Sequence, residues 1–262
     1  LWPWVMARRD RGLGKRVAAG RSPVGAILDR LPGRASGVWR ALKVLGVMAA
    51  LAYPLFASIY QVNIMASALI YVGLGLGLNI VVGMAGLLNL GYAAFYAVGA
   101  YTYALLNHHF GFGFWFVLPL GGVLAALFGI VLALPVLRLR GDYLAIVTLG
   151  FGEIVRLVLE NWSTFSFGPS GISQIARPGF FGMHFTVASA TTYIYYILLV
   201  MIALTIFVTT RLNNSRIGRA LIALREDEIA CQAMGIDKTA VKLTAFALGA
   251  TWAGLMGVIF AA

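Results

Sequence analysis

The sequence predicts an all-α membrane protein, a polytopic helical bundle of about seven transmembrane segments with a cytoplasmic N-terminus. Two observations predict this fold class. Hydrophobic residues make up 61% of the 262 residues, with a mean hydropathy of +0.88, and basic residues are distributed unevenly between the loops. Soluble domains contain about 45–50% apolar residues. A soluble chain of this length could not bury so much apolar surface, so lipid is the expected solvent.

The predicted spans are runs close to the about 20 mainly apolar residues that a helix needs to cross the hydrocarbon core. Strands are a poor alternative, because the runs are long and do not alternate between apolar and polar residues. In chain order, the expected spans are residues 41–60, 63–82, 91–106, 114–137, 143–160, 191–210 and 239–262.

The loops predict the orientation, because short cytoplasmic loops carry an excess of Lys and Arg. With a cytoplasmic N-terminus, residues 138–142 and 211–238 lie on the cytoplasmic side, and they contain two Arg, and four Arg and one Lys, respectively. The opposite side receives residues 61–62, 107–113 and 161–190, which together contain a single basic residue, Arg177. The asymmetry is consistent from loop to loop and predicts that the N-terminus is inside.

Residues 1–40 form a basic segment ahead of a transmembrane domain at residues 41–262. Half of the twenty Lys and Arg lie in this segment or at its edge: Arg8, Arg9, Arg11, Lys15, Arg16, Arg21, Arg30, Arg34, Arg40 and Lys43. A basic segment next to a span fixes orientation and contacts anionic lipid, so the net charge of +11 predicts a lipid partner and no nucleic acid. The segment is too long for a signal peptide. Because residue 1 is Leu, we expect the true start to lie upstream or to be unusual.

The residue types that build catalytic and metal sites are scarce. Cys231 is the only cysteine, which excludes an intrachain disulfide and a cysteine-based metal cluster. The three histidines, His108, His109 and His184, lack H-x-x-x-H spacing, and we interpret them as exposed loop residues. We therefore expect no metal site and no catalytic residue, and a membrane enzyme is a remote interpretation.

The glycine-rich stretch at residues 71–101 contains two patterns. Gly73 and Gly77 form a G-x-x-x-G pair, which lets another helix approach closely. Residues 83–91 predict a reversal or an unwound helix, whose backbone polar groups must be buried in protein or line a cavity. Transporters place interrupted helices at substrate pathways, whereas the alternative here is close packing with ordinary turns. The candidate pathway residues are Asn79, Gly83, Gly86, Asn89 and Gly91.

Glu153 and Arg156 lie three residues apart in a predicted span, so they share a helix face and can pair. A charged pair in a membrane is costly and usually faces the bundle interior or water. Two interpretations stay open: a structural ion pair, or a gate or contact in a translocation route. Proton relay by Glu153 is disfavoured, because the neighbouring cation stabilises the ionised carboxylate.

The stretch REDEIACQAMGID at residues 225–237 is unusually polar. Of the nine Asp and Glu in the chain, four lie here: Glu226, Asp227, Glu228 and Asp237. The pattern predicts a short helix with charged residues 225–228 at its N-terminal end and Gly235 at its stop. Its small apolar face would consist of Ile229, Ala230, Ala233 and Met234. Such a helix lies on the membrane surface or docks in a groove of another protein.

Three stretches together resemble one family, the LivM-type permeases of branched-chain amino acid ABC importers. They are GLGLNIVVGMAGLLNLGYAAFYAVGAY, LRLRGDYLAIVTLGFGEIVR and ALREDEIACQAMGIDKTAVKLTAFALGATWAGLMG, and the similarity extends over residues 69–262. The resemblance implies an inner-membrane importer with a second permease subunit of LivH type, two cytoplasmic ATPases and a periplasmic substrate-binding protein. The resemblance implies that the partner ATPases bind ATP and Mg and that this chain binds no cofactor. The chain has no G-x-x-x-x-G-K-[ST] motif, which fits this implication.

The resemblance also assigns roles to residues. In such permeases a short cytoplasmic helix docks in a cleft of the ATPase, and Glu228-Ile-Ala followed by Gly235 resembles the E-x-A…G core of that coupling loop. The implied coupling loop is residues 211–238, and the periplasmic loop is residues 161–190. The implied ATPase-coupling residues are Arg225, Glu226, Asp227, Glu228, Ala230, Met234 and Gly235.

The implied function is import of leucine, isoleucine and valine, with Asn79, Asn89 and residues 83–91 lining the route. The alternative is a secondary amino-acid transporter driven by an ion gradient, which predicts buried acidic or histidine relays. Family members continue with further helices beyond the stretch VIFAA, so we expect this chain to be a fragment or a shortened protein.

Overall fold

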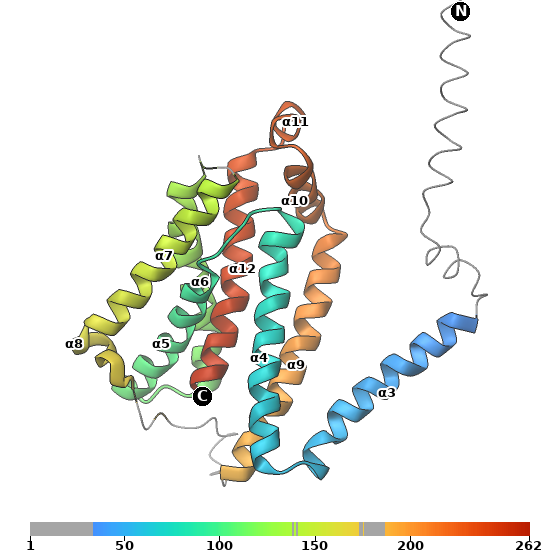
Figure 1. Cartoon of the computed structure of the whole chain (residues 1–262), viewed down its shortest axis with the longest axis vertical. Helices are drawn as coiled ribbons and strands as arrows, with labels where there is room; N and C mark the ends of the chain where they lie inside the picture. The colour runs from blue at the N-terminus through green and yellow to red at the C-terminus, as the bar shows by residue number, and fades with distance from the viewer. Residues whose placement is uncertain (1–33, 138, 140, 173–174, 176–186) are drawn as a thin grey trace, which may run out of the picture. The chain divides into compact units, whose positions relative to one another are not determined.

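The computed structural model of the chain describes residues 34–137, 139, 141–172, 175 and 187–262 (Figure 1). Every regular element in these ranges is a helix, so the predicted all-α fold is confirmed. The chain divides into two compact units, Leu1–Phe56 and Ala57–Ala262. Among the residues that the sequence singled out, the following lie outside the described ranges: residues 1–33, Arg138, Arg140, Arg177 and His184.

The first unit contains α3 (Arg34–Phe56), which has Pro54 in its last turn. The predicted loop at residues 61–62 is wrong, because α4 (Ile59–Asn79) already runs through these positions. Ser58 sets this start: its hydroxyl accepts the Gln61 backbone N–H, and Gln61 Oε1 accepts the Ser58 N–H at 3.0 Å. This reciprocal capping box fixes the helix start four residues earlier than the hydropathy pattern indicates.

The second unit holds the other helices. They are α4 with its continuation as a π-helix, η1 (Ile80–Met84), then α5 (Tyr92–Phe110), α6 (Phe114–Val136), α7 (Asp142–Asn161), α8 (Ser163–Ser166), η2 (Gly168–Ser170), α9 (Val187–Asn213), α10 (Arg216–Glu226), α11 (Glu228–Ala233) and α12 (Lys238–Ala261). Each predicted span therefore contains a helix. The predicted loop at residues 161–190 contains α8 and η2, and α9 begins within it.

Four helical stretches in the described ranges are long and apolar enough to cross a membrane: Ile59–Met84, Phe114–Val136, Ser189–Asn213 and Lys238–Ala261. A polytopic membrane protein is thus confirmed by length and composition. Helix α7 carries three charged residues between positions 143 and 160, which makes it less apolar than these four. The total of seven spans and the inward N-terminus stay predictions.

Helix α12 lies at the centre of the second unit and packs against α4, α5 and α6 (Figure 1). Small residues bring the backbones together: a Cβ on Gly99 of α5 would clash with the Gly254 carbonyl oxygen of α12. The predicted close approach at the G-x-x-x-G pair is confirmed. A Cβ on Gly73 would lie 2.7 Å from Met256 Sδ, and one on Gly77 would lie 2.8 Å from Trp252 Cβ.

Different helices lie at the two ends of the second unit. At one end, which we name the α11 end, lie α10, α11, η1 and the start of α7; at the other, the α8 end, lie α8 and the C-terminus of α12 (Figure 1). The predicted turn in the connection is confirmed at the α8 end, where Phe167, Gly168 and Gly171 have positive φ. The interpretation of the histidines as loop residues is wrong for His108 and His109, which lie in the last turn of α5.

Candidate functional site

The predicted helix interruption is present between α4 and α5. After the π-helix the chain leaves helical geometry at Ala85 and re-enters it at Tyr92, and we name residues 85–91 the break. Its backbone groups find partners: Leu87 N–H donates to the Val81 carbonyl at 3.1 Å, and Leu90 N–H donates to Thr148 Oγ1 of α7 at 3.1 Å. These pairings are of the kind that irregular backbone inside a membrane protein requires.

Two glycines let neighbouring helices contact the break directly. Gly86 has φ +69°, and a Cβ there would lie 2.5 Å from Arg225 Cγ of α10. A Cβ on Gly91 would clash with the Thr148 carbonyl oxygen of α7. The break is therefore held between α10 on one side and α7 on the other.

The two predicted pathway amides have different surroundings. Asn79 is exposed and lies against Gly83, since a Cβ on that glycine would clash with Asn79 Oδ1. Asn89, in the break, is only 3% exposed, and neither its Oδ1 nor its Nδ2 has a hydrogen-bond partner among the described residues. Leaving a buried polar group unsatisfied costs about 1–3 kcal/mol, so the Asn89 amide is an energetic cost that the packing of the described residues does not offset.

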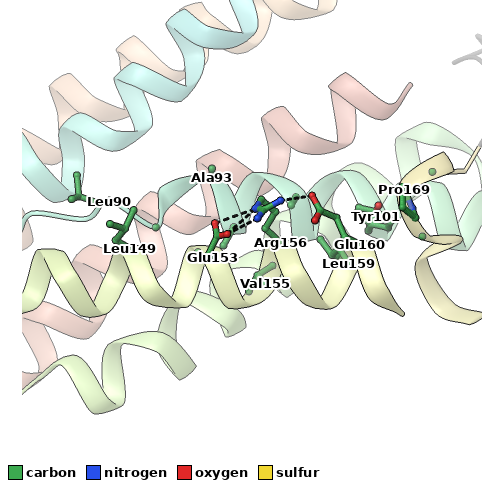
Figure 2. A pocket seen from close by; sticks show the side chains of 16 residues that line it. Leu90, Ala93, Tyr101, Leu149, Glu153, Val155, Arg156, Leu159, Glu160 and Pro169 are labelled. Atoms are coloured by element: carbon green, nitrogen blue, oxygen red, sulfur yellow. Dashed lines mark hydrogen bonds and ion pairs between the residues drawn. The ribbon is translucent and has the colours of Figure 1, made fainter. Parts of the chain in front are cut away.

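A hollow of about 550 Å³ opens between α5, α7 and the turn after α8 (Figure 2), and we name it the larger hollow because it exceeds the hollow on the other side of the break. Leu90 and Gly91 of the break line one end, and Gly168, Pro169 and Gly171 line the other. The hollow therefore extends from the α8 end of the unit to the break.

Three charged side chains of α7 lie in a row along this hollow, on the side of the helix toward α5 (Figure 2). The predicted pair is confirmed: Arg156 Nε donates to Glu153 Oε1 at 3.1 Å and to Oε2 at 3.0 Å. Arg156 Nη1 also donates to Glu160 Oε1, a contact that was not predicted although the four-residue spacing is favourable. All three side chains are about half exposed, with fractions of 53%, 53% and 44%. The charges thus line an open hollow.

The coupling loop at residues 211–238 folds into two helices where the sequence predicted one. Arg225 and Glu226 close α10, so their predicted place at the N-terminal end of α11 is wrong. Asp227 separates the helices: its backbone is extended, and its Oδ1 accepts the N–H groups of Ile229 and Ala230 at 2.7 and 3.0 Å. An aspartate N-cap of this kind starts a new helix.

The stop and the apolar face of α11 agree with prediction. Gly235 has φ +80°, and the next N–H, of Ile236, donates back to the Cys231 carbonyl at 3.2 Å. This geometry ends the helix in the manner typical of a C-terminal glycine. Ile229 is 68% exposed and Met234 is 82% exposed, and Ala230 is also exposed. We name Ile229 and Met234 the apolar knob of α11.

Arg225 and Glu228, two further charged residues of the coupling loop, bond to other parts of this chain. Arg225 Nη1 donates to the Gly83 carbonyl oxygen at 2.8 Å, and Arg225 Nη2 donates to Glu226 Oε1 at 2.8 Å. Glu228 Oε1 accepts from Lys242 Nζ of α12 at 2.9 Å, and that ammonium also donates to the Leu137 carbonyl at 3.3 Å. Lys242 is only 2% exposed. The sequence signal for it was available: a lysine inside the apolar run at residues 239–262.

A smaller hollow of about 240 Å³ lies between the break and the coupling loop. It is lined by residues 85–88 of the break, by Leu139, Gly141 and Leu144, by residues 224–228, and by Lys242. The break therefore separates two hollows, the larger one toward the α8 end and the smaller one at the α11 end. No cluster of metal-ligating side chains is found in the described ranges.

The chain matches the family described as "Branched-chain amino acid transport system / permease component" over residues 60–262. It is 49% identical over 233 residues to the high-affinity branched-chain amino acid transport system permease protein LivM of Salmonella typhimurium, covering 81% of this chain and 55% of that protein. It is 48% identical over 242 residues to LivM of Escherichia coli, covering 85% and 56%.

A more distant relative is the probable branched-chain amino acid transport permease protein LivM of Methanocaldococcus jannaschii, which is 26% identical over 238 residues, covering 76% of this chain and 68% of that protein. The chain thus spans little more than half the length of the two bacterial relatives. No solved structure matches it.

The match covers the break, the charged row of α7, the coupling loop and α12. Together with the four long apolar helices, it places the protein in the inner membrane as a multi-pass protein. The chain belongs to the family of permease components of branched-chain amino acid transport systems.

Proposed function

We propose that this chain is a membrane-spanning permease subunit of an ATP-driven importer for leucine, isoleucine and valine. Its partners would be a second permease subunit, two cytoplasmic ATPases that bind ATP and Mg, and a periplasmic protein that delivers the amino acid. The names of the two bacterial relatives support the substrate class. The observation that carries the proposal is that Arg225 of the coupling loop contacts both the π-helix, at the Gly83 carbonyl, and the break, at Gly86.

The exposed knob of α11 supports the ATPase partner. Ile229 in the first turn of α11 and Met234 directly after its last residue are large apolar side chains that lie outside the packed core of the unit. A helix that offers an apolar knob fits a groove on another protein. In this proposal the ATPase covers the knob, and Glu226, Asp227 and Gly235 shape the helix that presents it.

Movement of α11 would reach the membrane helices by two routes. The ion pair from Glu228 to Lys242 joins α11 to α12, and α12 packs on α4, α5 and α6. The hydrogen bond from Arg225 to Gly83 joins α10 to the π-helix at the end of α4. ATP binding in the partner would thereby shift the break, because packed helices pass on displacements of their neighbours.

The break is the proposed barrier on the substrate's route. Leu90 and Gly91 line the larger hollow and residues 85–88 line the smaller one, so the break lies between the two, and in this proposal its displacement connects them. Asn89 lies within it and has unsatisfied amide groups, which can hydrogen bond a passing amino acid. Asn79, Gly83 and Gly86 would affect transport indirectly, because they help to set the position of the break.

Uptake of radiolabelled leucine by a strain that lacks other branched-chain amino acid importers tests the proposal. We expect uptake to require the gene for this protein, and an ATPase to co-purify with it. Unchanged leucine uptake after deletion would contradict the proposal. Uptake that persists without ATP and stops with a protonophore would support an ion-coupled transporter.

A further inference from the structure

We propose that Glu153, Arg156 and Glu160 form a binding site for the ammonium group of the transported amino acid, in the larger hollow. We name these three residues the charged row. The inference rests on the proposed transport function and adds a site to it, on the α8 side of the break. The site takes a zwitterion with an apolar side chain.

The charge of the row is the first argument. Two carboxylates face one guanidinium, which leaves a formal charge of −1 on a helix in the predicted span 143–160. Arg156 contacts both oxygens of Glu153 but only Oε1 of Glu160. In the part of the chain that the structure describes, Glu160 Oε2 makes no hydrogen bond, so it is open to a donor.

The environment makes that open charge significant. A charged side chain in a membrane helix is costly and faces a water-filled cavity or a charged partner. The row is about half exposed and lies along the larger hollow, where a cation can reach it. An ammonium group, with three N–H donors, complements an unpaired carboxylate oxygen.

The rest of the hollow suits the remainder of a branched-chain amino acid. The apolar side chains that line the hollow include Leu90, Ala93, Leu149, Val155 and Leu159 (Figure 2). The volume of about 550 Å³ lies within the roughly 300–1,000 Å³ typical of small-molecule sites. A few charged groups beside an apolar wall is the usual composition of such a site.

The position of the larger hollow fits a substrate route that leads from the α8 end to the break. Gly168, Pro169 and Gly171 line the α8 end of the hollow, and Gly91 of the break lines its other end. An amino acid bound to the charged row would therefore lie immediately before the proposed barrier. Asn89, two residues from Gly91, would offer the next polar contact after the break moves.

A lysine or arginine from the second permease subunit is the competing occupant, because the hollow is open on this chain. The test must distinguish the substrate's ammonium group from a basic side chain of the second subunit. In the assembled transporter, a substrate site on the route stays accessible to water and small cations, whereas an ion pair between subunits is closed to them.

Thiol labelling in membranes that contain the whole complex tests accessibility. The chain has one cysteine, Cys231, which is buried, so an Ala93→Cys variant introduces a distinct reporter in the hollow. We expect a cationic methanethiosulfonate to react about ten-fold faster than an anionic one, because a cleft of one sign concentrates counter-ions. Glu160→Gln should remove most of this preference, and excess leucine should slow both reagents.

Uptake measurements give the second readout. At saturating binding protein, Glu160→Gln should lower leucine uptake on the order of ten-fold, the effect of losing one charge-assisted hydrogen bond. ATP hydrolysis and the recovery of partner subunits should be unchanged. Asp142→Asn is the matched control, since Asp142 lies on the same helix but does not line the hollow, and it should transport normally.

Three results would overturn the site while leaving the transport function intact. They are normal uptake by Glu160→Gln, equal labelling of Ala93→Cys by both reagents, and a loss of the second permease subunit that accounts for the whole loss of uptake. Absence of leucine uptake by the wild-type complex would instead contradict the proposed function itself.

Discussion

Lys242 and Glu228 form an ion pair of 2.9 Å that fastens the first residue of α11 to the start of α12. The lysine is buried, and the glutamate side chain is only 16% exposed. The resemblance implies an ATPase-coupling role for Glu228, and its carboxylate contacts α12 of this chain. The ion pair thus fastens α11 to α12, and in the proposed function the exposed knob meets the ATPase.

Lys242→Met should lower the free energy of unfolding, because it removes the close cation from an ion pair that is largely shielded from water. We expect a loss of roughly 1–3 kcal/mol, typical of a buried charged group deprived of its partner. Lys238→Met is the matched control: Lys238 Nζ lies 3.7 Å from the same carboxylate and the Lys238 side chain is 31% exposed, so the loss of unfolding free energy should be below about 1 kcal/mol. Thermal unfolding in detergent measures the loss of stability in both variants. Equal losses would contradict the stronger role assigned to Lys242.

Met234→Asp should abolish coupling without loss of stability. The side chain is 82% exposed, so the folded chain tolerates a charge there, whereas an apolar groove on a partner would not. We expect the ATPase to be lost from the purified complex and leucine uptake to stop, with membrane insertion unchanged. Gln232→Ala, also exposed on α11, is the control. Normal co-purification of the ATPase with Met234→Asp would exclude the knob as the docking point.

Charge and bulk at the two ends of α11 should also uncouple ATP hydrolysis from uptake. Glu228→Lys places a third ammonium beside those of Lys242 and Lys238, and their repulsion should displace α11. Gly235→Trp puts a bulky residue at φ +80°, which strains the end of the helix. Both variants should insert in the membrane and hydrolyse ATP without moving leucine. If both transport normally, the coupling assignment is wrong.

Gly86→Ala should damage the contact between the coupling loop and the break. Alanine at φ +69° costs about 1–2 kcal/mol, and its Cβ would also meet Arg225 Cγ at 2.5 Å. We expect a lower unfolding temperature and a fall in uptake per ATP hydrolysed. Gly75→Ala is the control, because nothing lies within 4 Å of its Cβ position, and helix propensity predicts a gain of about 0.5–1 kcal/mol. A thermal shift of the same sign in both variants would argue against the contact.

Asn89→Leu should separate stability from function. Removing an amide that is buried without partners should leave the unfolding temperature unchanged or raise it, while uptake falls because the polar contact in the break is gone. A structural asparagine would show the reverse, with a loss of stability that explains the loss of transport. Thermal unfolding and uptake of the same preparation distinguish the two outcomes.

Much of this arrangement follows from local sequence. Apolar runs of membrane length identified the helices, clustered glycines identified the break, and the three-residue spacing identified the pair of Glu153 and Arg156. Gly235 ended a helix as expected. These features depend on residues that are close in the sequence, so they can be predicted without knowledge of the tertiary fold.

The contacts that define the site depend on the tertiary fold. Arg225 and the Gly83 carbonyl are 142 residues apart, and Glu228 and Lys242 are joined only because α11 folds back on α12. The division into α10 and α11 was missed for a local reason, because the side chain of Asp227 caps the second helix. The unsatisfied amide of Asn89 also has no signal in the sequence, since burial is set by surrounding helices.

Leucine accumulation in proteoliposomes tests the central claim, that ATP drives amino acids past the break of this chain. The vesicles would contain the complex purified through this chain, with ATP inside and the binding protein and leucine outside. We predict accumulation against the gradient that requires ATP, ignores a protonophore and disappears in Met234→Asp. Accumulation that continues without ATP and collapses with the protonophore would contradict it.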